Sequence, residues 1–282
     1  MTSALSQSAQ LSSWRAQLDL EFERRAARTV LSARRHDGPL VVQKSLYPEG
    51  DEVCHTIVVH PPGGIAGGDD LELNVRLDAN AHALLTTPGA GKWYRSAGAA
   101  ARQSIQFYAS AGACLEWLPQ ENIIFAGARA ELRTEVHLIG DGSFIGWEIY
   151  CLGRSGSGEN FTNGSVRART LIDRDHRALW LENAQLEGGA AALQSPVVLA
   201  GHSVVGTLMA VSDKLDSAVL RPCRNIQPLT GDGAVTLLPG IIIGRYLGTS
   251  SEAAKNYFIK LWHALRPVVS GRAAIDPRIW RT

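Results

Sequence analysis

Hydrophobic and polar residues alternate along most of this chain, and the alternation begins close to its N-terminal end. Intervening polar residues separate Trp14, Ala16, Leu18, Leu20 and Phe22. A period of two is typical of a β-strand that buries one of its faces. Further strands are predicted at residues 29–32, 40–43, 55–59, 71–77, 82–86, 102–108, 114–118, 122–125, 131–138, 143–151, 165–172, 178–186, 204–211 and 235–246. Glycine, proline, asparagine or aspartate separates most of these runs, as a mainly β chain requires.

Helical spacing of apolar residues is confined to two segments late in the chain. In the clearer one, Ser250 or Ser251 can cap the helix, and Pro267 is expected to end it. Its apolar stripe is formed by Ala254, Phe258, Leu261, Trp262 and Leu265. A second, weaker helix is predicted at residues 212–220, with Pro222 just beyond it. The pattern therefore predicts a mainly β architecture in packed layers, with about two α-helices.

No repeat, low-complexity tract or linker divides the chain, so we expect a single domain at residues 14–282. Residues 1–13 are polar and lack the basic start and apolar core of a secretory signal, and we expect a flexible tail there. No run of about eighteen apolar residues predicts a transmembrane helix. The four cysteines are widely spaced, which favours free thiols in a reducing compartment. We therefore expect a cytoplasmic protein.

The composition excludes some partners. Among the 282 residues, 45% are hydrophobic and 20% are charged, which are ordinary values for a soluble globular protein. The formal net charge of +1 gives no basic footprint of the kind that nucleic-acid-binding proteins carry. We accordingly predict neither a nucleic acid nor a membrane as partner.

The catalytic motifs that the sequence approaches are incomplete. Residues 89–92 read GAGK, like the end of a phosphate-binding loop, but Trp93 stands where the magnesium-binding serine or threonine belongs. Residues 201–206 resemble a nucleophile elbow, but Val205 occupies the place of its second glycine. No pair of histidines has the H-E-x-x-H spacing of a zinc site. We therefore predict no catalytic residue.

The most distinctive segment is HPPGGIAGGD at residues 60–69. Its two prolines fix φ and remove backbone donors, while its four glycines allow conformations closed to other residues, so it forms a shaped corner between strands. His60, Asp69 and Asp70 are possible ligands beside this corner, and His60 is the best metal candidate among the histidines. A structural turn without any ligand is the alternative interpretation.

This corner is the first of several segments that match one family in order and spacing. They are HPPGGIAGGD at 60–69, LLTTPGAGKWYRS at 84–96, LEWLPQENIIF at 115–125, LGRSGSGENF at 152–161 and RPVVSGRAAIDPRIW at 266–280. Through these motifs the chain resembles the UreD family of urease accessory proteins, called UreH in some species, over nearly its whole length. One departure is Gly91, where a threonine or serine is common in the family.

The resemblance implies a non-enzymatic role: a scaffold or metallochaperone required for nickel insertion into apo-urease. It also implies a hetero-oligomeric complex with UreF and with UreG, a GTPase that delivers nickel, and a passage for nickel in transit without a tightly bound cofactor. The family fold is predominantly β with two helices, in agreement with the hydrophobic pattern. We expect layered, solenoid-like β-sheets in a single UreD-type domain with about two α-helices.

A transit route for nickel should be rich in oxygen ligands and bind weakly, because tight histidine or cysteine coordination would trap the ion. We predict Asp69, Glu148 and Glu182 as route residues, with His60 as a further transient nickel ligand. The alternative for each carboxylate is that it caps a turn or pairs with an arginine. Two other functional classes stay open, a β-rich hydrolase and a carbohydrate-binding module with exposed tryptophans, although neither has a visible site.

Overall fold

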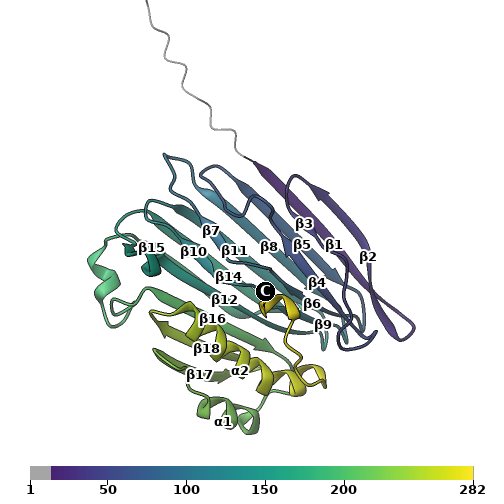
Figure 1. Cartoon of the computed structure of the whole chain (residues 1–282). Coiled ribbons are helices and arrows are strands. Elements are labelled where there is room, and N and C mark those ends of the chain that lie inside the picture. The colour runs from purple at the N-terminus through teal and green to yellow at the C-terminus, as the bar shows by residue number, and fades with distance from the viewer. Residues whose placement is uncertain (1–13, 282) are drawn as a thin grey trace, which may run out of the picture.

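The computed structural model describes residues 14–281, which form three layers (Figure 1). A seven-stranded sheet faces an eleven-stranded sheet, and two α-helices cover the outer side of the second sheet. The flexible tail predicted at residues 1–13 lies outside the described residues.

The order of the strands across each sheet differs from their order along the chain. From one edge to the other, the first sheet consists of β15 (Arg177–Glu187), β14 (Ser165–Arg174), β11 (Arg129–Leu138), β8 (Ala101–Ala109), β5 (Asp70–Leu77), β1 (Arg15–Arg25) and β2 (Arg28–Asp37). The main path of the second sheet is β17 (Asp232–Leu238), β18 (Ile241–Gly248), β16 (Val204–Val211), β12 (Ser143–Arg154), β9 (Cys114–Trp117), β6 (His82–Thr86), β4 (Val53–Val59) and β3 (Val41–Val42). Beside β12 lie β10 (Asn122–Ile124), which also pairs with β7 (Gly91–Trp93), and β13 (Glu159–Asn160). The helices are α1 (Ser217–Asn225) and α2 (Ser251–Ser270), with 3-10 turns η1 (Ser155–Ser157), η2 (Ala191–Gln194) and η3 (Arg278–Arg281).

The long strands from β4 to β14 alternate between the two sheets, which gives the fold its solenoid-like character. Neighbouring strands are parallel within each sheet along this stretch. Their registers are continuous, so that Leu73 on β5 lies opposite Ile105 on β8, which lies opposite Thr134 on β11. Antiparallel pairing occurs at the ends of the sheets, as between β14 and β15 or between β16 and β18. The predicted mainly β, solenoid-like fold of a single domain with two α-helices is confirmed.

Two hydrophobic clusters hold the layers together. The cluster between the sheets includes Leu18, Phe22, Phe107, Trp117 and Phe144. The cluster between the second sheet and the helices includes Trp147, Leu208, Phe258, Leu261 and Trp262. Gly206 on β16 allows α2 to lie close to the sheet, because a Cβ at that position would come within 2.7 Å of the Phe258 ring. The alternation predicted for the first strand and the apolar stripe predicted for the last helix are therefore both core faces.

The C-terminal helix is longer than expected. α2 begins after Ser250, a predicted cap whose Oγ accepts a backbone hydrogen bond, but it continues through Pro267. The prediction that Pro267 ends the helix is wrong. The proline removes only one backbone donor, whereas burial of Arg266 and the left-handed cap at Gly271 (φ 73°) stabilise the last turn.

Two other predicted boundaries are also wrong. α1 begins after its capping residue Asp216 and contains Pro222, so the predicted span 212–220 starts and ends too early. The predicted strand at 235–246 is instead the hairpin of β17 and β18, because the chain turns at Gly240 with φ 75°. The short strands β7 and β13 were not predicted.

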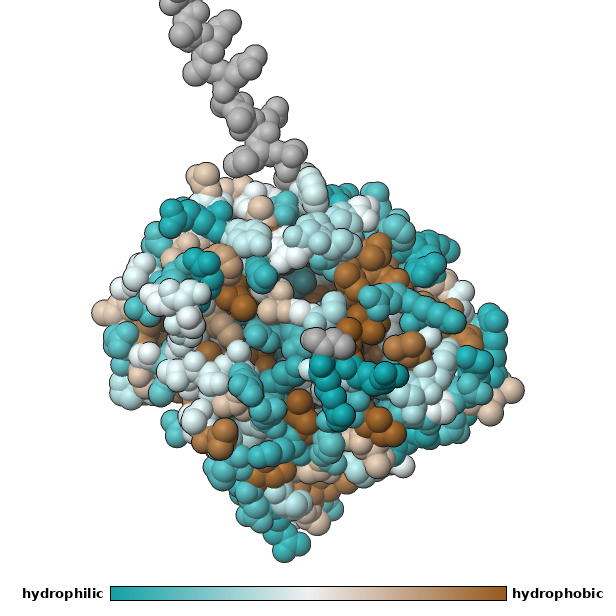
Figure 2. All heavy atoms as spheres, in the orientation of Figure 1, coloured by the Kyte–Doolittle hydropathy of each residue, from teal (hydrophilic) through white to brown (hydrophobic). Residues whose placement is uncertain are grey.

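The surface has no single dominant feature on the face seen in Figure 2, where hydrophobic side chains lie in small groups among hydrophilic ones. Among residues 14–281, no helix is both long and apolar enough to cross a membrane. The four cysteines are free thiols, as their spacing predicts.

Candidate functional site

A cavity of about 310 Å³ lies between the two sheets. Three loops with family-like motifs form its mouth, and they include residues 60–65, 87–92 and 119–122. Inward-facing residues of β5, β8 and β11 line one side, and residues of β9 and β12 line the other. Most of this lining is apolar, but Thr134, Glu148 and Tyr150 place oxygen atoms in the cavity between the sheets. The cavity therefore joins a loop-lined mouth to an interior carboxylate.

The glycine- and proline-rich corner forms part of the mouth. Asp69 shapes this corner, because its carboxylate accepts hydrogen bonds from Ala66 N at 2.8 Å and Trp14 N at 3.0 Å. Gly64 packs against the aromatic ring of Tyr94, and a Cβ there would come within 2.1 Å of that ring. The corner and the segment around Tyr94 are thus fitted to each other. Asp69 itself is not part of the cavity lining.

His60 does line the mouth of the cavity. Burial lowers the pKa of this histidine, and the charge of Asp69 opposes that effect. A histidine with a lowered pKa is mostly neutral at pH 7 and has a lone pair available for a metal ion. The predicted transient ligand is therefore placed at an entrance, in a protonation state that suits it.

Glu148 lies between the sheets, and its accessible surface faces the cavity. Its carboxylate accepts hydrogen bonds from three hydroxyl groups, those of Thr134 (2.5 Å), Tyr150 (2.7 Å) and Thr170 (3.2 Å). Burial raises the pKa of Glu148, the three hydroxyl donors lower it, and the charge of Glu182 raises it, with a net upward direction. Glu148 is therefore an interior carboxylate held by neutral donors.

Two rows of polar side chains extend from Glu148 across the interior. On the first sheet, the registers align Thr134, Thr170 and Glu182 on adjacent strands. On the second sheet, they align Glu148, Thr207 and Arg245. Arg245 joins the rows at their far end by donating hydrogen bonds to Glu182 (2.6 Å) and to Thr207 (2.7 Å). We call these six residues the polar seam.

The polar seam connects the interior with the surface. The side chains of Glu182 and Arg245 are 28% and 39% exposed, whereas Thr134 and Thr170 are buried. Of the four predicted site residues, Glu148 and Glu182 thus share one seam, His60 lies at the cavity mouth, and Asp69 supports the corner.

The other seam residues were missed from the sequence, although a signal for them exists. On β11 the inward-facing residues Ala130, Leu132, Val136 and Leu138 are apolar, and Thr134 alone breaks the series. On β12, Glu148 follows Phe144 and Gly146 in the same way. A polar residue at an inward position of a strand whose other inward residues are apolar or glycine is therefore the sequence signal for a seam residue.

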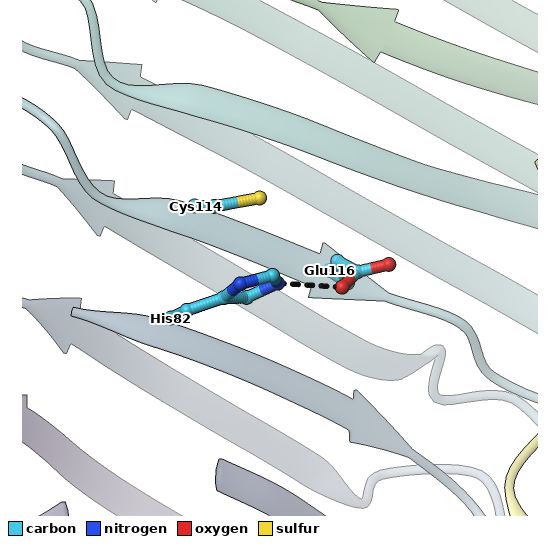
Figure 3. Close-up of side chains that lie close together, drawn as sticks. All are labelled: His82, Cys114 and Glu116. Atoms are coloured by element: carbon cyan, nitrogen blue, oxygen red, sulfur yellow. Dashed lines mark hydrogen bonds and ion pairs between the residues drawn. The ribbon is translucent and has the colours of Figure 1, made fainter. Parts of the chain in front are cut away.

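A second polar cluster lies on the opposite face of the second sheet, under α2. His82 on β6 and Cys114 on β9 are cross-strand neighbours, and Glu116 lies two residues further along β9 on the same face (Figure 3). Glu116 accepts hydrogen bonds from His82 (2.7 Å), Trp262 (2.6 Å) and Arg266 (3.0 Å). The sequence analysis did not predict these contacts of Glu116.

Electrostatic coupling in this cluster is strong. Burial alone would raise the pKa of Glu116, but the hydrogen bond and charge of His82 and the charge of Arg266 lower it to about 2. Burial alone would lower the pKa of His82, but Cys114 and Glu116 raise it to about 10. His82 and Glu116 therefore form a charged pair, and Arg266 reaches a second carboxylate, Glu49, at 2.7 Å.

Comparison with known proteins assigns the family. The family model of the UreD urease accessory protein matches residues 15–281. A protein named urease accessory protein UreD from Azoarcus sp. (strain BH72) is 57% identical over 269 residues, covering 95% of this chain and 94% of the relative. Proteins of the same name from Dechloromonas aromatica and Pseudomonas aeruginosa are 50% and 48% identical, each over 100% of both chains. The chain therefore belongs to the UreD family and is an accessory protein of urease, not an enzyme.

Proposed function

We propose that this protein passes nickel to apo-urease through the cavity and the polar seam, in a complex with UreF and UreG. Family membership supports the link to urease. The observation that carries the route is the position of Glu148, where the cavity meets the polar seam. Nickel is cargo on this route and is not retained as a cofactor.

The chemistry of Glu148 suits a passing divalent cation. Within residues 14–281, its hydrogen-bond partners are three neutral hydroxyls, and no cationic side chain forms an ion pair with it. A carboxylate without a cationic partner in an interior of low dielectric is costly, and an incoming cation offsets that cost. Carboxylate and hydroxyl oxygens also hold nickel less tightly than a set of imidazoles and thiolates, which favours release.

The two ends of the route have different chemistry. At the mouth, His60 offers a neutral imidazole, and Asp69 keeps the corner in shape. At the other end, the guanidinium of Arg245 donates a hydrogen bond to the carboxylate of Glu182. A cation that reaches this carboxylate must therefore displace the guanidinium. Asp69 therefore contributes to the route through the position of His60, while Glu148 and Glu182 contact the ion.

The cellular setting follows from the same proposal. Nickel delivery by UreF and UreG takes place where urease is assembled, which we assign to the cytoplasm. Free thiols at all four cysteines fit a reducing compartment of this kind.

Glu148→Gln tests the route while it preserves the shape of the side chain. Apo-urease is incubated with nickel, UreF, UreG and either the wild-type protein or this variant, and the nickel bound per urease is measured. We expect the variant to enter the complex normally but to load urease with several-fold less nickel, because a neutral amide no longer attracts the cation.

Glu135→Gln is the matched control. Glu135 lies on β11 next to Thr134 and is also buried, but it pairs with Arg133 and not with the seam. This variant should load urease like the wild type. Equal loading by Glu148→Gln and the wild type, with the complex intact, would exclude Glu148 from the route.

A further inference from the structure

We propose that His82, Cys114 and Glu116 form a binding site for a borderline divalent transition-metal ion, separate from the polar seam. The three ligand atoms lie within 4.8 Å of one another, and all three residues are buried. Within the part of the chain that the structure describes, this is the one group of histidine, cysteine and acidic side chains that meets this spacing.

The ligand set determines which ions would bind. One imidazole nitrogen, one thiolate sulfur and one carboxylate oxygen suit ions such as Zn²⁺, Co²⁺ or Ni²⁺, whereas Mg²⁺ prefers oxygen ligands alone. Metal–ligand distances of about 2.0–2.3 Å require the 2.7 Å hydrogen bond between His82 and Glu116 to open and the three side chains to turn toward a common point. Side-chain rotation can supply this movement, because the three residues project from two adjacent strands on the same face (Figure 3).

Access to the site is provided by a second cavity of about 340 Å³, which His82 and Cys114 line. This cavity lies apart from the one that Glu148 lines, since the two sets of lining residues share no member. Its charged lining is balanced between Arg24, Lys214 and Arg272 and the acids Glu52, Asp141 and Asp213. An ion can therefore reach the ligands with water as its fourth ligand, without passing along the polar seam.

The surroundings of Glu116 are compatible with a bound ion. Trp262 donates to Glu116 Oε2, an outer contact that orients the carboxylate. Arg266 also donates to Glu49 through both terminal nitrogens, at 2.7 and 2.8 Å, so it stays paired when Glu116 turns toward an ion. Arg266 therefore keeps Glu49 as a carboxylate partner when Glu116 binds the ion.

Titration of the full chain with Co²⁺ tests this assignment, because thiolate ligation gives a near-ultraviolet sulfur-to-cobalt charge-transfer band. We expect the wild-type band to saturate at one ion per chain, to disappear on addition of Zn²⁺ and to persist in excess Mg²⁺. Cys114→Ser should abolish the band, and His82→Gln should weaken Co²⁺ binding by about tenfold or more.

Cys54→Ser is the matched control, because Cys54 is also buried and its sulfur contacts Thr56 and no member of the ligand group. It should retain the full band. Circular dichroism establishes that each variant is folded before titration. Absence of the band in the wild type, or its persistence in folded Cys114→Ser, would overturn the assignment. The titration contains no urease, so either result leaves the test of the nickel route unaffected.

Discussion

At the residue scale, three predicted carboxylates have three different surroundings. Asp69 accepts two backbone hydrogen bonds at a turn, and Glu182 pairs with Arg245. These contacts match the alternative interpretation, in which each carboxylate caps a turn or pairs with an arginine. Glu148 differs from both, because within residues 14–281 its carboxylate accepts hydrogen bonds from hydroxyl groups alone and its pKa is raised. All three side chains are carboxylates, so the fold determines how their surroundings differ.

The raised pKa of Glu148 predicts a specific pH dependence of stability. The carboxyl group binds its proton more tightly in the folded protein, so its contribution to the free energy of unfolding is fully present below the unfolded pKa, about 4.5. That contribution is lost as the pH rises through the folded pKa. Glu148→Gln removes this titration. We expect the stability of the wild type relative to the variant to decrease between about pH 5 and about pH 8.

Urea unfolding of both proteins at the two pH values measures this difference. Taking the wild type relative to the variant cancels the contributions of other groups, such as His82, that titrate alike in both. A difference that stays constant with pH would contradict the interior environment described for Glu148.

At the element scale, α2 is attached to the second sheet by charge as well as by apolar packing. Arg266 is fully buried and contacts both Glu116 and Glu49. The lowered pKa of Glu116 means that its contribution to stability is present above about pH 4.5 and is lost as the pH falls through about 2. The raised pKa of His82 gives a contribution that is present below about 6.5 and is lost as the pH rises through about 10.

Arg266→Met should therefore be strongly destabilising. Methionine fills much of the space, but it leaves two buried carboxylates without their shared cation, which costs about 3–5 kcal/mol. Arg102→Met is the control, since the exposed pair of Arg102 and Glu131 contributes at most about 1 kcal/mol. Chemical denaturation at pH 7 measures both changes. Similar small losses for the two variants would show that Arg266 does not fix α2.

Much of the element list could be predicted from the sequence, because hydrophobic alternation is a local property. The stripe of α2 and the inward face of β1 follow directly from it. The end of α2 could not be predicted, because Pro267 argues for a stop while Arg266 is held by Glu116, 150 residues away. The polar seam is equally non-local: Thr134, Thr170 and Glu182 meet only through strand register. The sequence therefore led us to predict Glu148 and Glu182 as route residues without indicating that they lie in one row of contacts.

At the scale of the whole molecule, the solenoid-like winding creates the cavity and the polar seam. Each passage of the chain between the sheets adds one strand to both, so that polar residues in register form continuous rows between them. Loops from three different motifs form the mouth of the cavity. At the far end of the polar seam, Glu182 on β15 pairs with Arg245 on β18. The proposed nickel route therefore depends on the fold as a whole and not on one loop or strand.

The most direct test of that account interrupts the polar seam without removing any carboxylate. Thr170→Val deletes the hydroxyl between Glu148 and Glu182, and Thr56→Val is the control at a buried threonine outside the seam. The measurement is the nickel content of urease after maturation with UreF, UreG and each variant, in complexes shown to be intact. We predict several-fold less nickel with Thr170→Val and normal nickel with Thr56→Val. Normal nickel with Thr170→Val would contradict transfer through the polar seam.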